Sequence, residues 1–179
     1  MITFIQNLDI KIIQFIEEHL NYESLQLFFL FITKLNDYGL LTFLAVAFII
    51  IQYKDTRITK ICIYSTILSL IIVQLMMKNI IQRPRPYELI TGLNIIIKKP
   101  LTHSFPSGHA SISGIGFILS YLYFERKLVK YFFMILFFLV AISRLILKVH
   151  FLSDVVIGFS LALLIVLTIY FIMKKYVKT

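Results

Sequence analysis

The sequence is poor in charge and in cysteine, and it has no tryptophan. Only 15% of its 179 residues are charged, whereas an average globular protein has about 25%. So few polar side chains cannot cover a soluble globule, and a hydrophobic share of 59% excludes a disordered chain. The lone Cys62 excludes an internal disulfide, and it lies in an apolar run where a thiol behaves as a small hydrophobe. The composition therefore predicts an integral membrane protein, with a single domain over residues 1–179.

Five apolar segments predict an all-α, polytopic helical bundle in the membrane. A transmembrane helix needs about 17–25 residues, and two of the five segments reach this length only if they extend into their flanks. The segments are 39–53, 61–82, 110–124, 128–147 and 151–173. The last three are separated by only a few residues, so we expect tight turns between antiparallel neighbours.

Residues 1–36 have a different pattern. Apolar residues recur with helical spacing around Ile12, but charged residues such as Asp9 and Glu17 interrupt them. This pattern is typical of an amphipathic helix lying in the membrane interface, and it does not fit a cleavable signal peptide. The apolar run 25–32 is too short to cross alone and indicates a half-helix, with a sixth span as the alternative. The bundle is thus expected to have five to six transmembrane helices.

The basic residues predict the orientation of the chain. Lys and Arg number 18 against 9 acids, and half of the 18 fall within 54–60, 126–130 and 174–178. These places lie on one side under a five-span count, so the positive-inside rule puts them, and the C-terminus, in the cytoplasm. Basic residues in such loops set orientation, and we expect no nucleic-acid partner. The loop 83–105 then faces the extracytoplasmic side of the cell membrane.

That outer side also carries cations where they are costly. Lys78, Arg144 and Lys148 lie at or within apolar segments, and the loop adds Arg83 and Arg85. Charges at such positions are usually functional. The sequence therefore predicts a cationic basin that binds an anion.

Three short clusters converge on this basin, and the first is Lys78 followed after six residues by Arg85-Pro86. Pro84 and Pro86 favour extended backbone at the residues before them, so the helix cannot continue. A lysine point charge and an arginine fork together suit the oxygens of a phosphate. The alternative interpretation is a pair of cations that mark the headgroup level.

The second cluster is Pro106-Ser107-Gly108-His109, which opens an apolar segment. Serine is a favoured N-cap, glycine allows close approach of a ligand, and a helix N-terminus attracts anions. His109 would lie beside the bound anion. The alternative is a simple helix cap with an interfacial histidine.

The third cluster is Ser143-Arg144, five residues, His150, three residues and Asp154. Residues four apart share a helix face, so we expect Asp154 to bond Nδ1–H of His150 and to leave Nε2 free for attack. A His–Asp pair that only caps the helix is the alternative.

Together the clusters resemble the signature of the type 2 phosphatidic acid phosphatase family, which includes the vanadium haloperoxidases. The matching positions span 78–154, and the helical membrane remainder agrees with the lipid phosphatase branch. The eleven matches are Lys78, Arg85, Pro86, Pro106, Ser107, Gly108, His109, Ser143, Arg144, His150 and Asp154.

The resemblance implies a role for each site residue. His150 would be the nucleophile that forms a phosphohistidine, Asp154 would orient it, and His109 would be the general acid and then base. The phosphate oxygens would be held by Lys78, Arg85, Ser107, the Gly108 amide and Arg144. The family needs no metal or other cofactor, and the acids here are too few and scattered for a magnesium site.

The resemblance also implies a substrate class, a lipid phosphate drawn from the bilayer, with no obligate protein partner. Small chains of this kind in the family often act on undecaprenyl diphosphate, and a composition rich in Ile, Lys and Phe without Trp is typical of an AT-rich bacterial genome. Phosphatidylglycerophosphate, phosphatidate and lipid A phosphates are alternatives. An anion transporter and a non-catalytic lipid-phosphate binding protein are the competing classes, which leave the two histidines and Asp154 without chemical work.

Overall fold

The computed structural model describes residues 2–176 and is built from helices, as predicted. The α-helices are α1 (Ile2–His19), α2 (Glu23–Leu35), α3 (Leu40–Tyr53), α4 (Thr56–Ser69), α5 (Lys78–Ile81), α6 (Pro86–Leu89), α7 (Gly108–Tyr123), α8 (Lys127–Ile146) and α9 (Leu152–Tyr176). A 3-10 turn, η1 (Asp37–Gly39), joins α2 to α3, and a π-helical stretch, η2 (Leu70–Met77), joins α4 to α5. Within residues 2–176 no strand is formed.

Four helical segments are long and apolar enough to cross a membrane. They are Glu23–Tyr53, Thr56–Leu89, Lys127–Ile146 and Leu152–Lys175, with 31, 34, 20 and 24 residues. The 16-residue α7 is shorter, about 24 Å at 1.5 Å per residue, and it packs against α3, α8 and α9. The all-α membrane fold is thus confirmed with four candidate spans, and a larger number that includes α7 stays a prediction.

The half-helix predicted at 25–32 is α2, which leads through a break into α3. At the break, Tyr38 and Gly39 have φ angles of 55° and 75°, in the left-handed region that interrupts a right-handed helix. A Cβ on Gly39 would lie 2.7 Å from Cγ1 of Ile112, so this position needs glycine both for its conformation and for contact with α7. The two helices therefore form one kinked candidate span.

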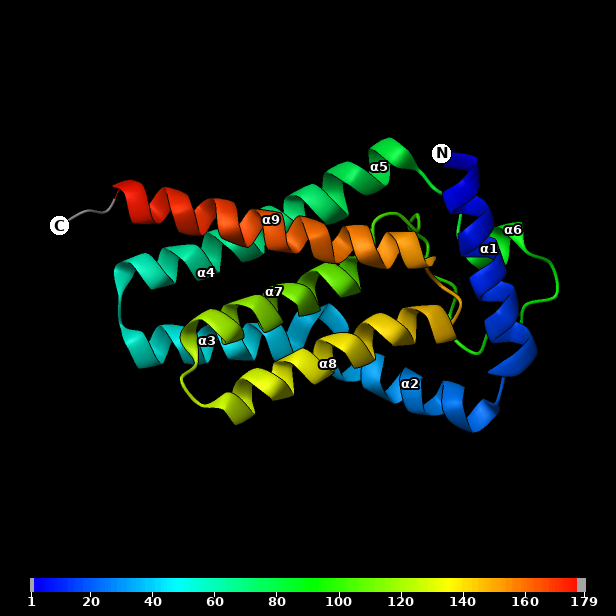
Figure 1. Ribbon diagram of the computed structural model, residues 1–179, viewed down its shortest axis with the longest axis horizontal. Coiled ribbons are helices and arrows are strands. Elements are labelled where there is room, and N and C mark those ends of the chain that lie inside the picture. Colours follow the sequence, from blue (N-terminus) through cyan, green and yellow to red (C-terminus); the bar gives the residue numbers. More distant parts are fainter. Residues whose placement is uncertain (1, 177–179) are drawn as a thin grey trace.

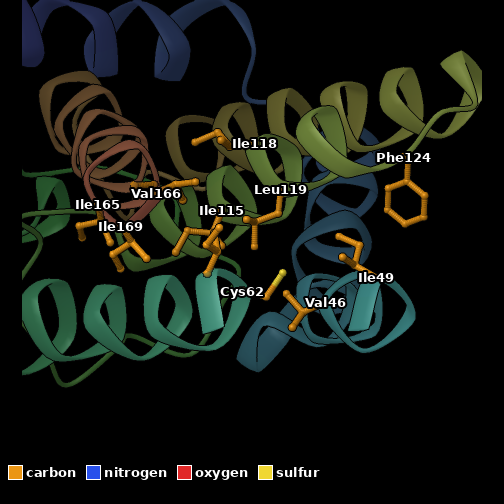
Figure 2. Packing of buried hydrophobic residues seen from close by; sticks show 12 residues of the cluster. Val46, Ile49, Cys62, Ile115, Ile118, Leu119, Phe124, Ile165, Val166 and Ile169 are labelled. Carbon is orange, nitrogen blue, oxygen red and sulfur yellow. The ribbon is translucent and has the colours of Figure 1, made fainter. Parts of the chain in front are cut away.

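The hydrophobic core surrounds α7. Figure 2 shows Ile115 and Leu119 of α7 packed among side chains of α3, α4 and α9. Cys62 is fully buried in this cluster, as expected for a thiol in an apolar run. The core fixes α7, and with it the residues at the start of α7, relative to the spans.

The two ends of the bundle carry different elements (Figure 1). The α3–α4 turn, the α7–α8 connection and the last turns of α9 lie together at one end, here called the lysine end. The predicted grouping of the basic residues at 54–60, 126–130 and 174–175 on one side agrees with this arrangement, and Lys178 lies outside the described residues. At the opposite end, here called the site end, lie α1, α6 and the α8–α9 connection.

Helix α1 lies across the site end, where it contacts α8 and α9 (Figure 1). It is amphipathic as predicted, with Phe4 and Phe15 exposed and Ile13 and Ile16 buried. The interpretation of Asp9 as an interruption of the apolar pattern is wrong, because its side chain faces the bundle and is only 2% exposed.

Candidate phosphate-binding site

Arg85 links three segments of the site end. Helix α5 ends at Ile81, and Arg85 adopts the extended backbone that Pro86 favours, with φ −82° and ψ 160°. Its Nε donates to the carbonyl of Thr102 and its Nη1 to the carbonyl of Val149, both at 2.7 Å. The guanidinium is thereby fixed between the loop after α6 and the α8–α9 connection.

Lys78 and Arg144 approach from the ends of two helices. Lys78 is 6% exposed, and its Nζ lies 3.4 Å from Oγ1 of Thr102, which also accepts from Arg85. Arg144, in the last turn of α8, donates from Nη1 to Oγ1 of Thr33 at 2.5 Å. Its Nε is buried and has no hydrogen-bond partner among the described residues.

These three buried cations are not neutralised by the protein. Among residues 2–176, no carboxylate lies within 4.0 Å of the charged nitrogens of Lys78, Arg85 or Arg144. Burying a charge without a partner costs several kcal/mol, on the order of what a bound anion would return. The first and third sequence clusters thus come together as predicted, in an arrangement that suits a negatively charged ligand.

The second cluster forms the N-terminus of α7. The hydroxyl of Ser107 accepts from Ala110 N at 3.4 Å, which confirms the predicted N-cap, and Ser107 N donates to the carbonyl of Asp154 at 3.0 Å. Gly158 permits this contact, since a Cβ there would lie 2.5 Å from the carbonyl oxygen of Ser107. Ser107 therefore ties the start of α7 to the beginning of α9, while a Cβ on Gly108 would meet Gln74 of η2 at 1.9 Å.

His109 follows in the same turn and contacts an acid that sequence reasoning did not assign to the site. Its Nε2 lies 3.4 Å from Oδ1 of Asp37, in the break between α2 and α3. A groove of about 210 Å³ runs between this break and η2, and its walls include Tyr38, Leu70 and His109. Asp37 is distant in sequence from the motifs, and only the bend of the chain at the break brings it here.

His150 lies in the connection between α8 and α9. Helix α9 begins at Leu152, so the expectation that His150 shares a helix face with Asp154 is wrong. Asp154 instead folds back over its own helix start: Oδ2 accepts from Phe151 N at 2.9 Å and lies 3.6 Å from Nδ1 of His150. This is an ion-pair distance and longer than a hydrogen bond, so Nδ1 has no hydrogen-bond partner among the described residues.

The surroundings of His150 favour the neutral imidazole. Burial lowers the pKa of His150 well below its usual value of 6.5, and the charges of Arg144, Arg85 and Lys78 lower it further. All three cations therefore act on the same ring. A neutral imidazole at physiological pH is the form that can attack phosphorus.

Two cations that the sequence assigned to the basin have other partners. Arg83 donates from Nη1 to Oδ1 of Asp154 at 2.5 Å and from Nη2 to Oδ2 of Asp9 at 2.8 Å. Lys148 is fully buried and donates from Nζ to Glu17 at 2.5 Å. The prediction that Arg83 and Lys148 belong to the anion-binding basin is therefore wrong for both residues. The cause is the same, because acids of α1, far away in the sequence, neutralise these side chains.

All eight predicted site residues thus lie at the site end, and their individual roles stay predictions. Three cations, two histidines and a helix N-terminus lie together there, while Asp154 is bonded to Arg83 and Phe151 N and lies beside His150. Among the described residues, no group of three or more His, Cys, Asp or Glu is placed to hold a metal ion.

Comparison with known proteins identifies the fold and the family. Residues 58–178, more than half of the chain, match the PAP2 superfamily. The crystal structure of LpxE from Aquifex aeolicus is 24% identical, with a TM-score of 0.74 over 93% of this chain and 94% of that chain. The first transmembrane PAP2 type phosphatidylglycerolphosphate phosphatase from Bacillus subtilis is 22% identical, with a TM-score of 0.73 over 96% and 87%. No curated protein matches.

Proposed function

Because this chain belongs to the PAP2 superfamily and is a membrane lipid phosphatase, we propose that it works through a phosphohistidine at His150, without a metal ion. The observation that supports this mechanism best is the set of three buried cations, none neutralised by a carboxylate among the described residues, around one neutral histidine. A phosphate monoester or diphosphate supplies the negative charge that these cations lack. The free Nε–H of Arg144 is a donor available to one of its oxygens.

In the first step, Nε2 of His150 attacks the terminal phosphorus, and the bond from this phosphorus to the leaving oxygen breaks; that oxygen is the ester oxygen of a monoester or the bridging oxygen of a diphosphate. Burial and the same cations lower the pKa of His109, so it takes up a proton once the bound phosphate offsets those cations. His109 donates this proton to the leaving oxygen, and the carboxylate of Asp154 stabilises the positive charge on the phosphorylated imidazole. In the second step, water attacks the phosphorus and His109 accepts its proton, so inorganic phosphate leaves and both histidines return to their first state.

The cations and the α7 N-terminus supply the catalytic electrostatics. Phosphoryl transfer requires positioning and charge stabilisation more than covalent assistance. Lys78, Arg85 and Arg144 are already oriented by protein contacts, so they need little reorganisation as charge shifts to the phosphoryl oxygens.

The lipid tail is proposed to reach the site sideways from the bilayer. The groove between the α2–α3 break and η2 leads to Gly108 and His109, and Tyr38 at its margin is 97% exposed. The phosphate would then occupy the cationic basin while the tail remains among lipids. Loop charges support an extracytoplasmic site and a cytoplasmic C-terminus.

Undecaprenyl diphosphate, cleaved to undecaprenyl phosphate, is our first choice of substrate. It rests on the small size of the chain and its composition. Phosphatidylglycerophosphate is the principal alternative, since the Bacillus subtilis neighbour is described as a phosphatase of that lipid. Phosphatidate and lipid A phosphates complete the panel to be tested.

The test is phosphate release by the purified protein in detergent with EDTA present, comparing wild type with His150→Ala on all four lipids. Release by wild type alone supports the proposal, and the best substrate identifies the lipid. Asp154→Asn should reduce turnover by several orders of magnitude, on the order of 10⁴-fold, without unfolding the protein. Lipid-phosphate binding or transport that survives in His150→Ala, with no release by wild type, would instead favour the non-catalytic classes.

A further inference from the structure

Helix α1 contacts the catalytic end of α9 through one buried carboxylate. Oδ1 of Asp9 accepts from Ser153 N at 3.0 Å, and Oδ2 accepts from the hydroxyl of Ser153. Ser153 is in the first turn of α9, so Asp9 supplies a negative charge to the N-terminus of a helix to which it does not belong. Asp9 also lies outside residues 58–178, the part of the chain that matches the family.

Arg83 connects Asp9 to the carboxylate beside His150. Its Nη2 is 2.8 Å from Asp9, its Nη1 is 2.5 Å from Asp154, and its guanidinium carbon lies 4.2 Å from the ring centre of Phe151. The planar fork thus has a different carboxylate on each nitrogen and an aromatic ring on its face. Because Arg83 holds Oδ1 of Asp154, Oδ2 is directed to Phe151 N and His150.

The charges of this trio do not cancel. Two carboxylates share one guanidinium, so one negative charge is left over beside His150. If Asp9 were neutral, Arg83 would compensate Asp154 completely, and a positively charged His150 would lose its counter-charge. The cations on the phosphate side repel a positive charge on His150. The net negative charge of the trio is therefore what stabilises it.

We propose that Asp9 is a positioning residue for the phosphatase reaction: through Arg83 and Ser153 it holds Asp154 directed at His150, and it leaves the trio with one net negative charge. The inference rests on the proposed role of His150 as the nucleophile. It makes α1 a part of the catalytic machinery, in addition to its place at the membrane surface.

The test is Asp9→Asn in the full-length purified enzyme, assayed with the best substrate of the panel. We expect kcat to fall about 10- to 100-fold, the usual effect of losing a group that orients a catalytic residue. The KM should change less than about threefold, because the groups that bind the phosphate are untouched. Glu18→Gln removes the same charge from an exposed position of the same helix and should leave kcat unchanged.

The acid limb of the pH–rate profile separates positioning from a structural role. Loss of the negative charge of Asp9 disfavours the imidazolium form of His150, so the acid limb of the pH–rate profile of Asp9→Asn should move to lower pH. Asp9→Glu keeps the charge and should keep the acid limb of wild type. The charged or titratable groups facing His150 are Arg144 from α8, Lys78 from α5, Arg85 from the loop, His109 from α7 and Asp154 from α9.

A wild-type kcat per folded molecule in Asp9→Asn, or a reduced kcat with an unmoved limb, would overturn the proposal. If Asp9→Asn does not fold, Arg83→Lys replaces it, because one ammonium cannot hold both carboxylates in the same geometry. Its kcat should fall at least tenfold, and a wild-type kcat would again reject the inference. An active His150→Ala enzyme would reject the proposed function itself, so the two failures are distinguishable.

Discussion

The two ends of the bundle hold the same kinds of cations in opposite environments. At the lysine end, Lys54, Arg126 and Lys127 are exposed in short connections. At the site end, Arg85 and Arg144 are 2% and 4% exposed; Arg85 donates to the carbonyls of Thr102 and Val149, and Arg144 donates to Thr33. The comparison teaches that burial and fixed hydrogen bonds, and not the number of basic residues, distinguish the candidate binding site from the other charged face.

The energetic consequences differ in the same way. Exposed cations are solvated and contribute little to stability, roughly 0–1 kcal/mol per ion pair. At the site end, acids of α1 neutralise the buried Lys148 and, together with Asp154, the half-buried Arg83. The buried cations left without a carboxylate among the described residues are those that match the phosphatase signature.

The largest difference between the ends is expected in catalysis. Arg144→Gln removes a positioned donor from the transition state and should lower kcat/KM by about 10²- to 10³-fold. Arg126→Gln makes the same change at the lysine end and should stay within about twofold of wild type. Steady-state phosphate release by both variants, normalised to folded protein, checks this pair, and equal losses would contradict the contrast between the ends.

A second difference is expected in stability. Lys148→Met leaves Glu17 without its buried partner and should destabilise the fold by about 1.5–3 kcal/mol, the usual value of a hydrogen bond to a charged group. Lys60→Met at the lysine end should leave the melting temperature unchanged, since Lys60 is exposed. Thermal unfolding in detergent measures both, and a melting temperature of Lys148→Met equal to wild type would show that the pair contributes nothing.

The smallest effect concerns pH and extends the comparison to His150, which is buried at the site end. Its lowered pKa means that the unfolded chain binds a proton near pH 6.5 while the folded chain does not. This contribution to stability is present above about pH 6.5 and is lost progressively as the pH falls towards the folded pKa. Wild type should therefore lose more stability on acidification than His150→Gln. Parallel pH dependences of the two melting temperatures would argue against a neutral buried imidazole.

Local features of the sequence predicted local features of the structure well. The prolines after Arg83 and Arg85 are unsuited to a helix interior, and they lie between the end of α5 at Ile81 and the first residue of α6, Pro86. Ser107 caps α7 because its hydroxyl reaches an amide three residues away. Apolar segments likewise predicted the helices that pack around α7. The start of α9 was predicted too early, because the Asp154 side chain accepts from Phe151 N and the helix begins after it.

Long-range pairing could not be predicted. Asp9 meets Arg83 over 74 residues and Glu17 meets Lys148 over 131, and nothing in the local pattern of α1 indicates which basic residues its acids contact. The break at η1 could not be predicted either, because it involves the close approach of Gly39 to α7, a contact between distant parts of the sequence. The site could therefore be assigned from its motifs, whereas the partners that neutralise its neighbours needed the structure.

The bond between Asp9 and Ser153 also has a consequence for biosynthesis. The two residues are 144 positions apart, in α1 and α9, so this contact cannot form until α9 has been synthesised. Helix α1 is thus made well before the helix start to which Asp9 binds, and its final attachment to α9 is a late event in biosynthesis.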